Sequence, residues 1–218
     1  MSETLEITLR SIAVSGLATL VAAVPGVPAG LTLALSTGRA ARAGLVLANA
    51  GMALPPVLVG LVVALVLWRG GPLGGLGLIY TPAAMVAAQA IIAFPLVVAL
   101  TAAAVRALEP DLWTQTMALG ATRAQAARLL LREARGGLLA AVLAGFGAAL
   151  SEVGAVMMVG GNIAGQTRVL TTSVLQATRM GEFERALGLG AVLLGLSVAV
   201  SCCVTIAQGK PWRRRPAR

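Results

Sequence analysis

Long runs without a charged residue are the feature that most constrains this chain. Four such runs cover residues 11–38, 43–68, 70–105 and 186–209. A fifth run, 136–160, is interrupted only by Glu152. Each is longer than the roughly 20 residues that a helix needs to cross the hydrocarbon core of a bilayer. Charged residues make up 11% of the chain, less than half of the share of about 25% that is usual in soluble domains. The sequence therefore predicts an all-α, polytopic membrane protein.

We predict five transmembrane helices, in which every backbone polar group is hydrogen-bonded inside its own helix. They lie near residues 11–36, 43–67, 82–105, 138–160 and 187–207. The N-terminus does not resemble a secretory signal peptide, because two glutamates, Glu3 and Glu6, stand where such a peptide needs positive charge. Residues 1–218 are thus expected to form a single transmembrane domain without a separate soluble domain.

The placement of the 17 basic residues predicts the orientation of the chain. If five spans alternate across the membrane, one side holds 12 of these residues. The other side holds Arg10, Arg69, Arg168, Arg179 and Arg185. The richer side is expected to be cytoplasmic. The N-terminus then lies outside, whereas the C-terminal basic tail (208–218) and the segment between the third and fourth spans (107–136, the cytoplasmic segment) lie inside.

Several function classes are disfavoured by composition. The basic tail follows a span directly, so orientation and contact with anionic lipid explain it better than nucleic-acid binding does. The chain has no histidine, and its adjacent Cys202 and Cys203 are interpreted as packed or lipid-facing thiols, so neither a metal site nor a disulfide framework is expected. A phosphate-binding Gly-rich loop is missing and only one carboxylate lies within the spans. An enzyme is therefore not expected.

Prolines interrupt three of the predicted spans. They are Pro25, Pro28, Pro55, Pro56 and Pro95. Each interior proline removes a helix hydrogen bond and is expected to bend its segment. Such bends either serve packing alone or belong to a protein that opens and closes, and their number favours the second interpretation.

The cytoplasmic segment carries the signals of two helices joined by a sharp turn. Pro110 suits the first turn of a helix, and Asp111 complements the positive end of its dipole. Gly120 suits a left-handed turn that ends this helix. Thr122 and Gln125 have the spacing of a capping box, which predicts the start of a second helix. The sequence therefore predicts helix, glycine turn, helix.

The second of these helices is expected to be amphipathic. One face carries Arg128, Arg132 and Arg135, and another carries Ala127, Leu130 and Ala134. Two interpretations remain open at this point: an interfacial helix whose arginines reach toward lipid headgroups, or a helix that packs against a partner protein.

This arrangement, which contains the sequence ALGAT, resembles the coupling loop of type I ABC importer permeases. Gly120 fits the glycine of the family signature and Leu130 its isoleucine position. The chain departs from the signature at the Glu-Ala-Ala and Leu-Pro positions, which here read Thr114, Gln115, Thr116 and Arg132, Glu133. The resemblance implies that a partner ATPase is contacted by Ala118, Leu119, Gly120, Ala121, Thr122 and Arg123.

A second stretch, residues 149–186, has the sequence ALSEVGAVMMVGGNIAGQTRVLTTSVLQATRMGEFERA. Together with ALPPVLVGLVV and GPLGGLGLIYTP, it resembles the permease subunits of tungstate importers. Molybdate and sulfate permeases carry similar segments, so these ions stay open as alternatives. The resemblance extends over about residues 8–207.

The resemblance implies the partners of the chain. They are a second copy in a homodimer, two cytoplasmic ABC ATPase subunits and an extracytoplasmic oxyanion-binding protein, in the cytoplasmic membrane of a bacterium or archaeon. ATP would be hydrolysed by the ATPases, and this chain would bind no cofactor, in agreement with its lack of a phosphate loop. A secondary transporter of the same anion is the less favoured alternative, because it would need ion-coupling groups of its own.

The resemblance to oxyanion permeases gives the polar residues of the fourth span and its outer loop candidate roles in the substrate path. A carboxylate in an apolar span is a functional candidate, but at Glu152 it would repel an anion. We therefore expect a structural or gating role for Glu152, with Arg168 as its partner, rather than substrate contact. Hydroxyl, amide and guanidinium donors are better suited to an oxyanion. These are Asn162, Thr167, Arg168, Thr171 and Thr172. The alternative is an outer loop whose polar groups face water.

Overall fold

The computed structural model describes residues 3–109 and 111–208, and within these ranges the chain forms helices and turns without a strand. The elements are α1 (Glu3–Leu35), α2 (Arg39–Met52), α3 (Pro56–Leu67), the 3-10 helix η1 (Gly74–Leu76), α4 (Pro82–Arg106), α5 (Leu112–Ala118), α6 (Arg123–Glu133), α7 (Arg135–Leu150), α8 (Gly154–Gly160), α9 (Leu170–Arg179) and α10 (Phe183–Gln208). The all-α prediction is confirmed. The basic tail, apart from Gln208 at the end of α10, lies outside the described residues.

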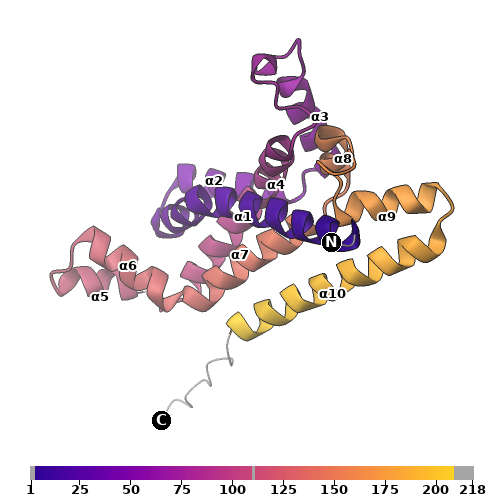
Figure 1. Cartoon of the computed structure of the whole chain (residues 1–218). Helices are drawn as coiled ribbons and strands as arrows, with labels where there is room; N and C mark the ends of the chain where they lie inside the picture. Colours follow the sequence, from indigo (N-terminus) through magenta and orange to yellow (C-terminus); the bar gives the residue numbers. More distant parts are fainter. Residues whose placement is uncertain (1–2, 110, 209–218) are drawn as a thin grey trace.

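Helices α1 and α4 pack along each other at the centre of the bundle, and α2 and α7 also pack on α4 (Figure 1). Small residues permit this contact, since Ala18 and Ala22 of α1 are buried against Ala90 and Ala93 of α4. At Gly30 the two main chains are so close that an added Cβ would lie 2.7 Å from a carbonyl oxygen of α4. Close backbone approach of this kind holds helices together in a bilayer, where lipid provides no hydrophobic drive for their association.

The prolines differ in what they do to the helices. Helix α1 continues through Pro25 and Pro28, and α4 continues through Pro95. Only the Pro55–Pro56 pair lies at a break, where Pro55 is extended (φ −62°, ψ 119°) and Pro56 begins α3. A residue that precedes a proline is disfavoured in the helical region, and Pro55 has no N–H to donate, so α2 cannot continue through the pair. The axes of α2 and α3 differ by 97°.

The predicted fourth span, 138–160, is not one helix. Helix α7 ends at Leu150, residues 151–153 are non-helical, and α8 begins at Gly154. The expectation that every backbone polar group is satisfied within its own helix is therefore wrong for this segment and for the second span. Non-helical backbone at membrane depth is tolerated where it is buried in protein or lines a water-filled cavity.

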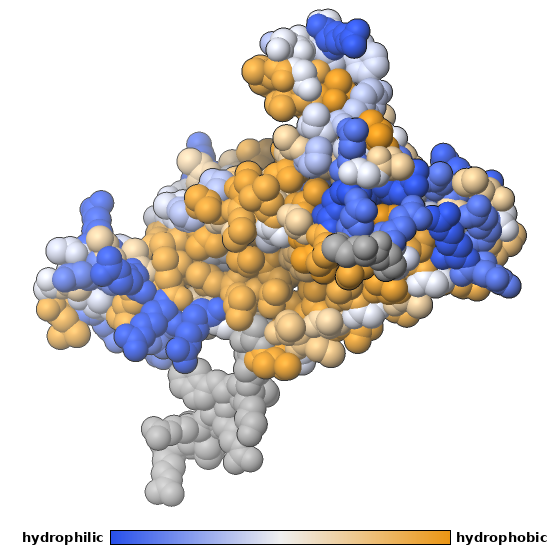
Figure 2. All heavy atoms as spheres, in the orientation of Figure 1, coloured by the Kyte–Doolittle hydropathy of each residue, from blue (hydrophilic) through white to orange (hydrophobic). Residues whose placement is uncertain are grey.

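Three helices of the described chain, α1, α4 and α10, are long and apolar enough to cross a membrane singly, and the number rises to five if the bent pairs α2–α3 and α6–α7 each count as one span. The middle of the surface is apolar, whereas hydrophilic residues gather over α5–α6 at one end and near α9 at the other (Figure 2). Helix α10 packs on α7 and α9 and leaves large side chains such as Leu187 (74% exposed) and Leu194 (65%) uncovered in the single chain. Such a surface suits contact with lipid or with another membrane-embedded chain.

Candidate functional site

The segment that we predicted to be cytoplasmic forms the expected helix, glycine turn and helix. Gly120 has φ +86°, and the end of α5 is a Schellman motif, in which Gly120 N–H donates to Met117 O at 3.0 Å and Ala121 N–H to Thr116 O at 3.3 Å. The left-handed conformation of Gly120 is thus confirmed. At the start of α5 Asp111 occupies the N-cap position without a side-chain cap hydrogen bond, and Pro110 lies outside the described residues.

Helix α6 begins with the predicted capping box. Gln125 N–H donates to Thr122 Oγ1 at 3.3 Å, and Thr122 N–H donates to Gln125 Oε1 at 2.8 Å. Two backbone donors at the helix start are thereby satisfied by side chains. This local pairing fixes where the turn stops and the second helix starts.

One face of α6 is packed and the other is free. Leu130 and Ala134 are buried in a cluster that includes Leu31 of α1 and Val105 of α4. Ala127, which we placed on this face, is half-buried and packs against the same cluster, and Ala126 is also buried (0% exposed). The opposite face exposes Arg128, Arg132 and Arg135. The helix is therefore anchored to the membrane-spanning bundle and presents its arginines outward.

The tip of the turn carries an exposed apolar side chain, that of Leu119. Leu119 is 89% exposed, more than any other large hydrophobic residue of the described chain. Ala118, Gly120, Thr122 and Arg123 beside it are also exposed, and Ala121 is half-buried. In the single chain the Leu119 side chain therefore makes little contact with the rest of the protein.

Helix α7 connects this segment to the middle of the bundle. Helices α6 and α7 meet at Ala134, which caps both, and their axes differ by 71°. Helix α7 has 16 residues, which corresponds to about 24 Å at a rise of about 1.5 Å per residue. Helix α7 therefore connects the end of α6 to the break that follows Leu150.

The two helix breaks line one cavity of about 440 Å³. Its lining residues are Gly51, Met52, Ala53, Leu54, Pro55, Pro56, Val59, Ile91, Ile92, Ala148, Ser151 and Glu152. Helix α3, which contributes Val59 to the lining, packs tightly on α8: a Cβ added to Gly60 would lie 2.5 Å from the Ala155 Cα. This central cavity places the non-helical backbone of both breaks beside space large enough for water.

Glu152 is held by its own neighbourhood and not by Arg168. Its Oε1 accepts a hydrogen bond from Ala155 N–H at 2.9 Å, and its backbone carbonyl accepts one from the Thr171 hydroxyl at 2.9 Å. Arg168 instead pairs with Glu3, with an Nη1–Oε1 distance of 3.4 Å. The predicted Glu152–Arg168 pair is therefore wrong. The carboxylate caps the first turn of α8 and lines the central cavity.

The polar residues of the outer loop are mostly used by the protein itself. Thr167 and Thr172 are fully buried. The Thr167 hydroxyl donates to Gly160 O at 2.5 Å and accepts from Ile163 N–H at 2.9 Å, and that of Thr172 bonds both backbone groups of Val169. These bonds support a structural role for both side chains, while a contact with the anion stays a prediction.

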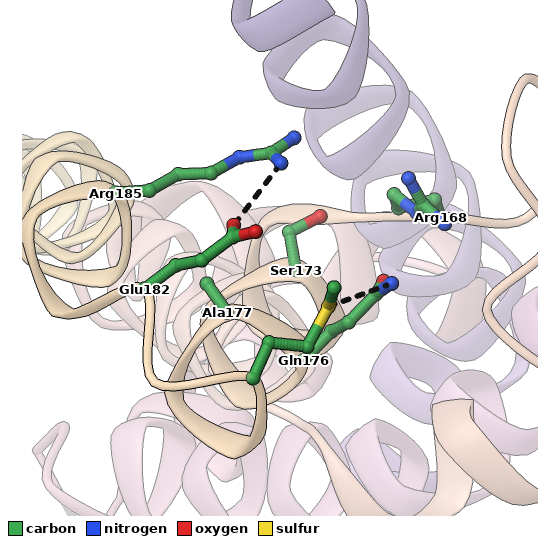
Figure 3. Close-up of a pocket in the computed structure, with 7 residues that line it drawn as sticks. Arg168, Ser173, Gln176, Ala177, Glu182 and Arg185 are labelled. Atoms are coloured by element: carbon green, nitrogen blue, oxygen red, sulfur yellow. Dashed lines mark hydrogen bonds and ion pairs between the residues drawn. The ribbon is translucent and has the colours of Figure 1, made fainter.

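Asn162 and Arg168 are also tied into the fold. Asn162 adopts φ +52°, and its Nδ2 donates to Gln176 Oε1 at 2.7 Å. The Arg168 side chain is 18% exposed and lines, with Gln176 and Arg185, a small hollow of about 20 Å³ (Figure 3). This hollow has little more than the room for one water molecule. The predicted oxyanion donors therefore do not converge on the central cavity in the single chain.

A cluster of ion pairs at this end was not predicted from sequence. Glu3 bridges Arg168 and Arg185, the latter at 2.9 Å. Arg185 also pairs with Glu182 at 3.3 Å (Figure 3). The cluster ties the start of α1 to the loop before α9 and to the start of α10. The two pairs made by Glu3 join residues 165 and 182 positions apart, and such separations give no local signal in the sequence. Each exposed pair contributes only about 0–1 kcal/mol, so the cluster mainly fixes geometry.

Within the described ranges, no group of three or more cysteine, histidine or acidic residues could hold a metal ion. The central cavity and the glycine turn are the two features considered for a function. The cavity lies beside the C-terminal end of α7, and the turn is connected to the N-terminal end of α7 through α6.

Comparison with known proteins gives a consistent result. The profile of a family described as "binding-protein-dependent transport system inner membrane component" matches residues 26–210. A relative named tungstate uptake system permease protein TupB, from Peptoclostridium acidaminophilum, is 41% identical over 91% of this chain and 87% of its own length. A probable anion ABC transporter permease protein from Haloferax volcanii is 40% identical over 89% of this chain and 86% of its own.

Two further proteins are less similar to this chain. The sulfate transport system permease protein CysT of Salmonella typhimurium is 31% identical over 74% of this chain and 61% of its own length. Among solved structures, the crystal structure of an amino acid ABC transporter with histidines has a TM-score of 0.65 and 21% identity over 94% of this chain and 92% of that one. The structural similarity shows that the fold is shared.

Proposed function

The chain belongs to the family of binding-protein-dependent transport system inner membrane components, and from this premise we propose that it is the permease subunit of an ATP-driven ABC importer that takes up tungstate. The relatives named as tungstate and anion permeases support this choice over most of the chain. The similarity to a sulfate permease supports sulfate as the second candidate cargo. Molybdate stays an alternative because it shares the shape and charge of tungstate.

The observation that carries the proposal is the continuous connection from an exposed turn to a cavity. Leu119 and Gly120 form the exposed tip of the turn. Helices α6 and α7 follow it and meet at Ala134 with a bend of 71°, and Ser151 and Glu152, just after α7, line the cavity. Movement of ATPase subunits against the tip would displace α6 and α7 together as a rigid body. A secondary transporter has no evident use for the turn, which favours the ATP-driven mechanism.

The partners follow from the same mechanism. We propose a homodimer, two cytoplasmic ABC ATPases that bind and hydrolyse ATP, and an extracytoplasmic oxyanion-binding protein. The permease itself binds no cofactor and catalyses no reaction. The exposed apolar surface and the two broken spans support a homodimer. Non-helical backbone at membrane depth must be buried in protein or line a water-filled cavity, and a second copy would provide such cover.

We also propose that the N-terminus is extracytoplasmic and that the C-terminus and α5–α6 are cytoplasmic, which rests on the split of the basic residues. The ATPase contact proposed for residues 118–123 requires this orientation. Labelling of single cysteines introduced near each end, in a background without Cys202 and Cys203, tests it. Labelling of both ends from the same side would contradict the five-span arrangement.

Uptake in cells tests the proposed function. Cells that carry the permease with its ATPase and binding protein should accumulate tungstate at low external concentration, and cells without the permease should not. Equal uptake after deletion of the permease would refute the proposal. Titration of the binding protein with tungstate, molybdate and sulfate decides the cargo, because selection falls to that protein.

A further inference from the structure

The central cavity carries a negative charge of its own. Among its described lining residues Glu152 is the charged one, and the others are apolar apart from Ser151. No described arginine or lysine forms an ion pair with Glu152. The cavity, about 440 Å³, far exceeds the roughly 10–15 Å³ needed for one water molecule. A single unpaired carboxylate therefore sets the sign of the charge that an incoming ion meets.

The local structure fixes where this charge lies. The Glu152 carbonyl is bonded to the Thr171 hydroxyl and its Oε1 to Ala155 N–H, so the side chain is held at the break between α7 and α8. The same cavity is also lined by the α2–α3 break at Ala53–Pro55. An oxyanion that enters this cavity meets the carboxylate. The cavity is partly open and main-chain polar groups share its lining, so the repulsion between like charges is screened in part, but less than in bulk water.

The position of Glu152 is also coupled to the cytoplasmic turn. It lies two residues beyond the end of α7, whose other end joins α6 at Ala134. Helix α8, in contrast, is packed against α3 through Gly60 and Ala155. A shift of α7 relative to this packed pair that breaks the hydrogen bonds of Glu152 to Ala155 and Thr171 would change the distance between the carboxylate and the α2–α3 break.

We propose that Glu152 is an electrostatic gate: its charge keeps oxyanions out of the central cavity in the resting protein, and movement of α7 removes it from the path during transport. This inference rests on the proposed function, because the motion is supplied by the ATPases. It gives a carboxylate in an anion path a definite use. Passive loss of anions across the membrane is prevented without a complete seal against water.

A charge variant that preserves the hydrogen bond tests the gate. Glu152→Gln keeps a side-chain oxygen for Ala155 N–H but removes the charge, whereas Glu152→Asp keeps the charge. The assembled permease–ATPase complex is placed in vesicles without ATP, and passive efflux of tungstate, chloride and glycerol is measured. We expect Glu152→Gln to raise efflux of both anions by about tenfold or more and to leave glycerol unchanged. Glu152→Asp should stay close to the unmodified protein.

Three results would overturn the gate. They are unchanged anion efflux in Glu152→Gln, an equal rise in Glu152→Asp, and a rise in glycerol efflux as large as that of the anions, which would indicate a loosened structure. Ser151→Lys provides a second test that leaves Glu152 and its cap intact. It adds a positive charge to the same lining and should also raise anion efflux, and the absence of a rise contradicts the inference even if Glu152→Gln does not assemble.

Failure of the proposed function gives a different result. In that case the unmodified complex with ATP and binding protein would not accumulate tungstate. The chloride comparison between the unmodified protein and Glu152→Gln needs neither ATP nor the binding protein, so it reports on the gate alone.

Discussion

Replacement of Gly120 by valine should impair the coupling of ATP hydrolysis to uptake without impairing folding. The φ of Gly120 is +86°, and an added Cβ meets nothing within 4 Å. The cost of a side chain is therefore conformational and not a clash. For an L-residue the left-handed region costs about 1–2 kcal/mol, and a β-branched residue is the least tolerant. A cost of this size lowers the ratio of native to non-native turn by a factor of about 5–30.

The expected consequence is loss of transport with intact assembly. The site lies outside the apolar part of the bundle, so Gly120→Val should insert and dimerise normally while uptake per ATP hydrolysed falls by about 5–30-fold. Gly120→Asn is the matched control, because asparagine tolerates the left-handed region and should reduce uptake much less. Both variants are reconstituted with ATPase and binding protein, and uptake and hydrolysis are normalised to assembled complex. Unchanged uptake by Gly120→Val would show that α5–α6 is only an interfacial helix pair.

Three further substitutions test other parts of the structure. Thr122→Ala removes the capping box of α6 and should destabilise its first turn by about 0.5–2 kcal/mol, seen as faster amide exchange there, and unchanged exchange would contradict the cap. Leu119→Asp should abolish co-purification of the ATPase while Leu119→Met retains it, and equal retention would remove Leu119 from the contact. Gly60→Ala should lower the thermal stability of the purified protein, because its Cβ would lie 2.5 Å from the Ala155 Cα. Gly75→Ala is the control, because a Cβ at Gly75 meets nothing within 4 Å. Equal stability of the two variants would contradict the α3–α8 packing.

Features set by a few neighbouring residues could be predicted from the sequence. The capping box of Thr122 and Gln125 and the left-handed turn at Gly120 depend on contacts within five residues, and both are present. The packed face of α6 was predicted at Ala127, Leu130 and Ala134, and all three belong to the cluster with Leu31 and Val105. The burial of Ala126 was not predicted.

The breaks in the spans and the partners of the charges could not be predicted in the same way. Pro25 and Pro95 lie inside continuous helices, whereas Pro55 and Pro56 end one, because two successive prolines remove two donors and force an extended residue. The break before α8 contains no proline and was missed. Arg168 was assigned to Glu152, but its partner is Glu3, 165 residues away, and a single sequence contains no signal for such a pairing.

The central claim is that ATP hydrolysis by partner subunits drives an oxyanion through this chain, and uptake by a purified system tests it most directly. Permease, ATPase and binding protein are reconstituted in vesicles, and accumulation of tungstate is measured with ATP, without ATP, and with the ATPase omitted. The account predicts accumulation only when ATP and all three components are present. Accumulation that persists without the ATPase and follows an ion gradient would contradict it and identify a secondary transporter.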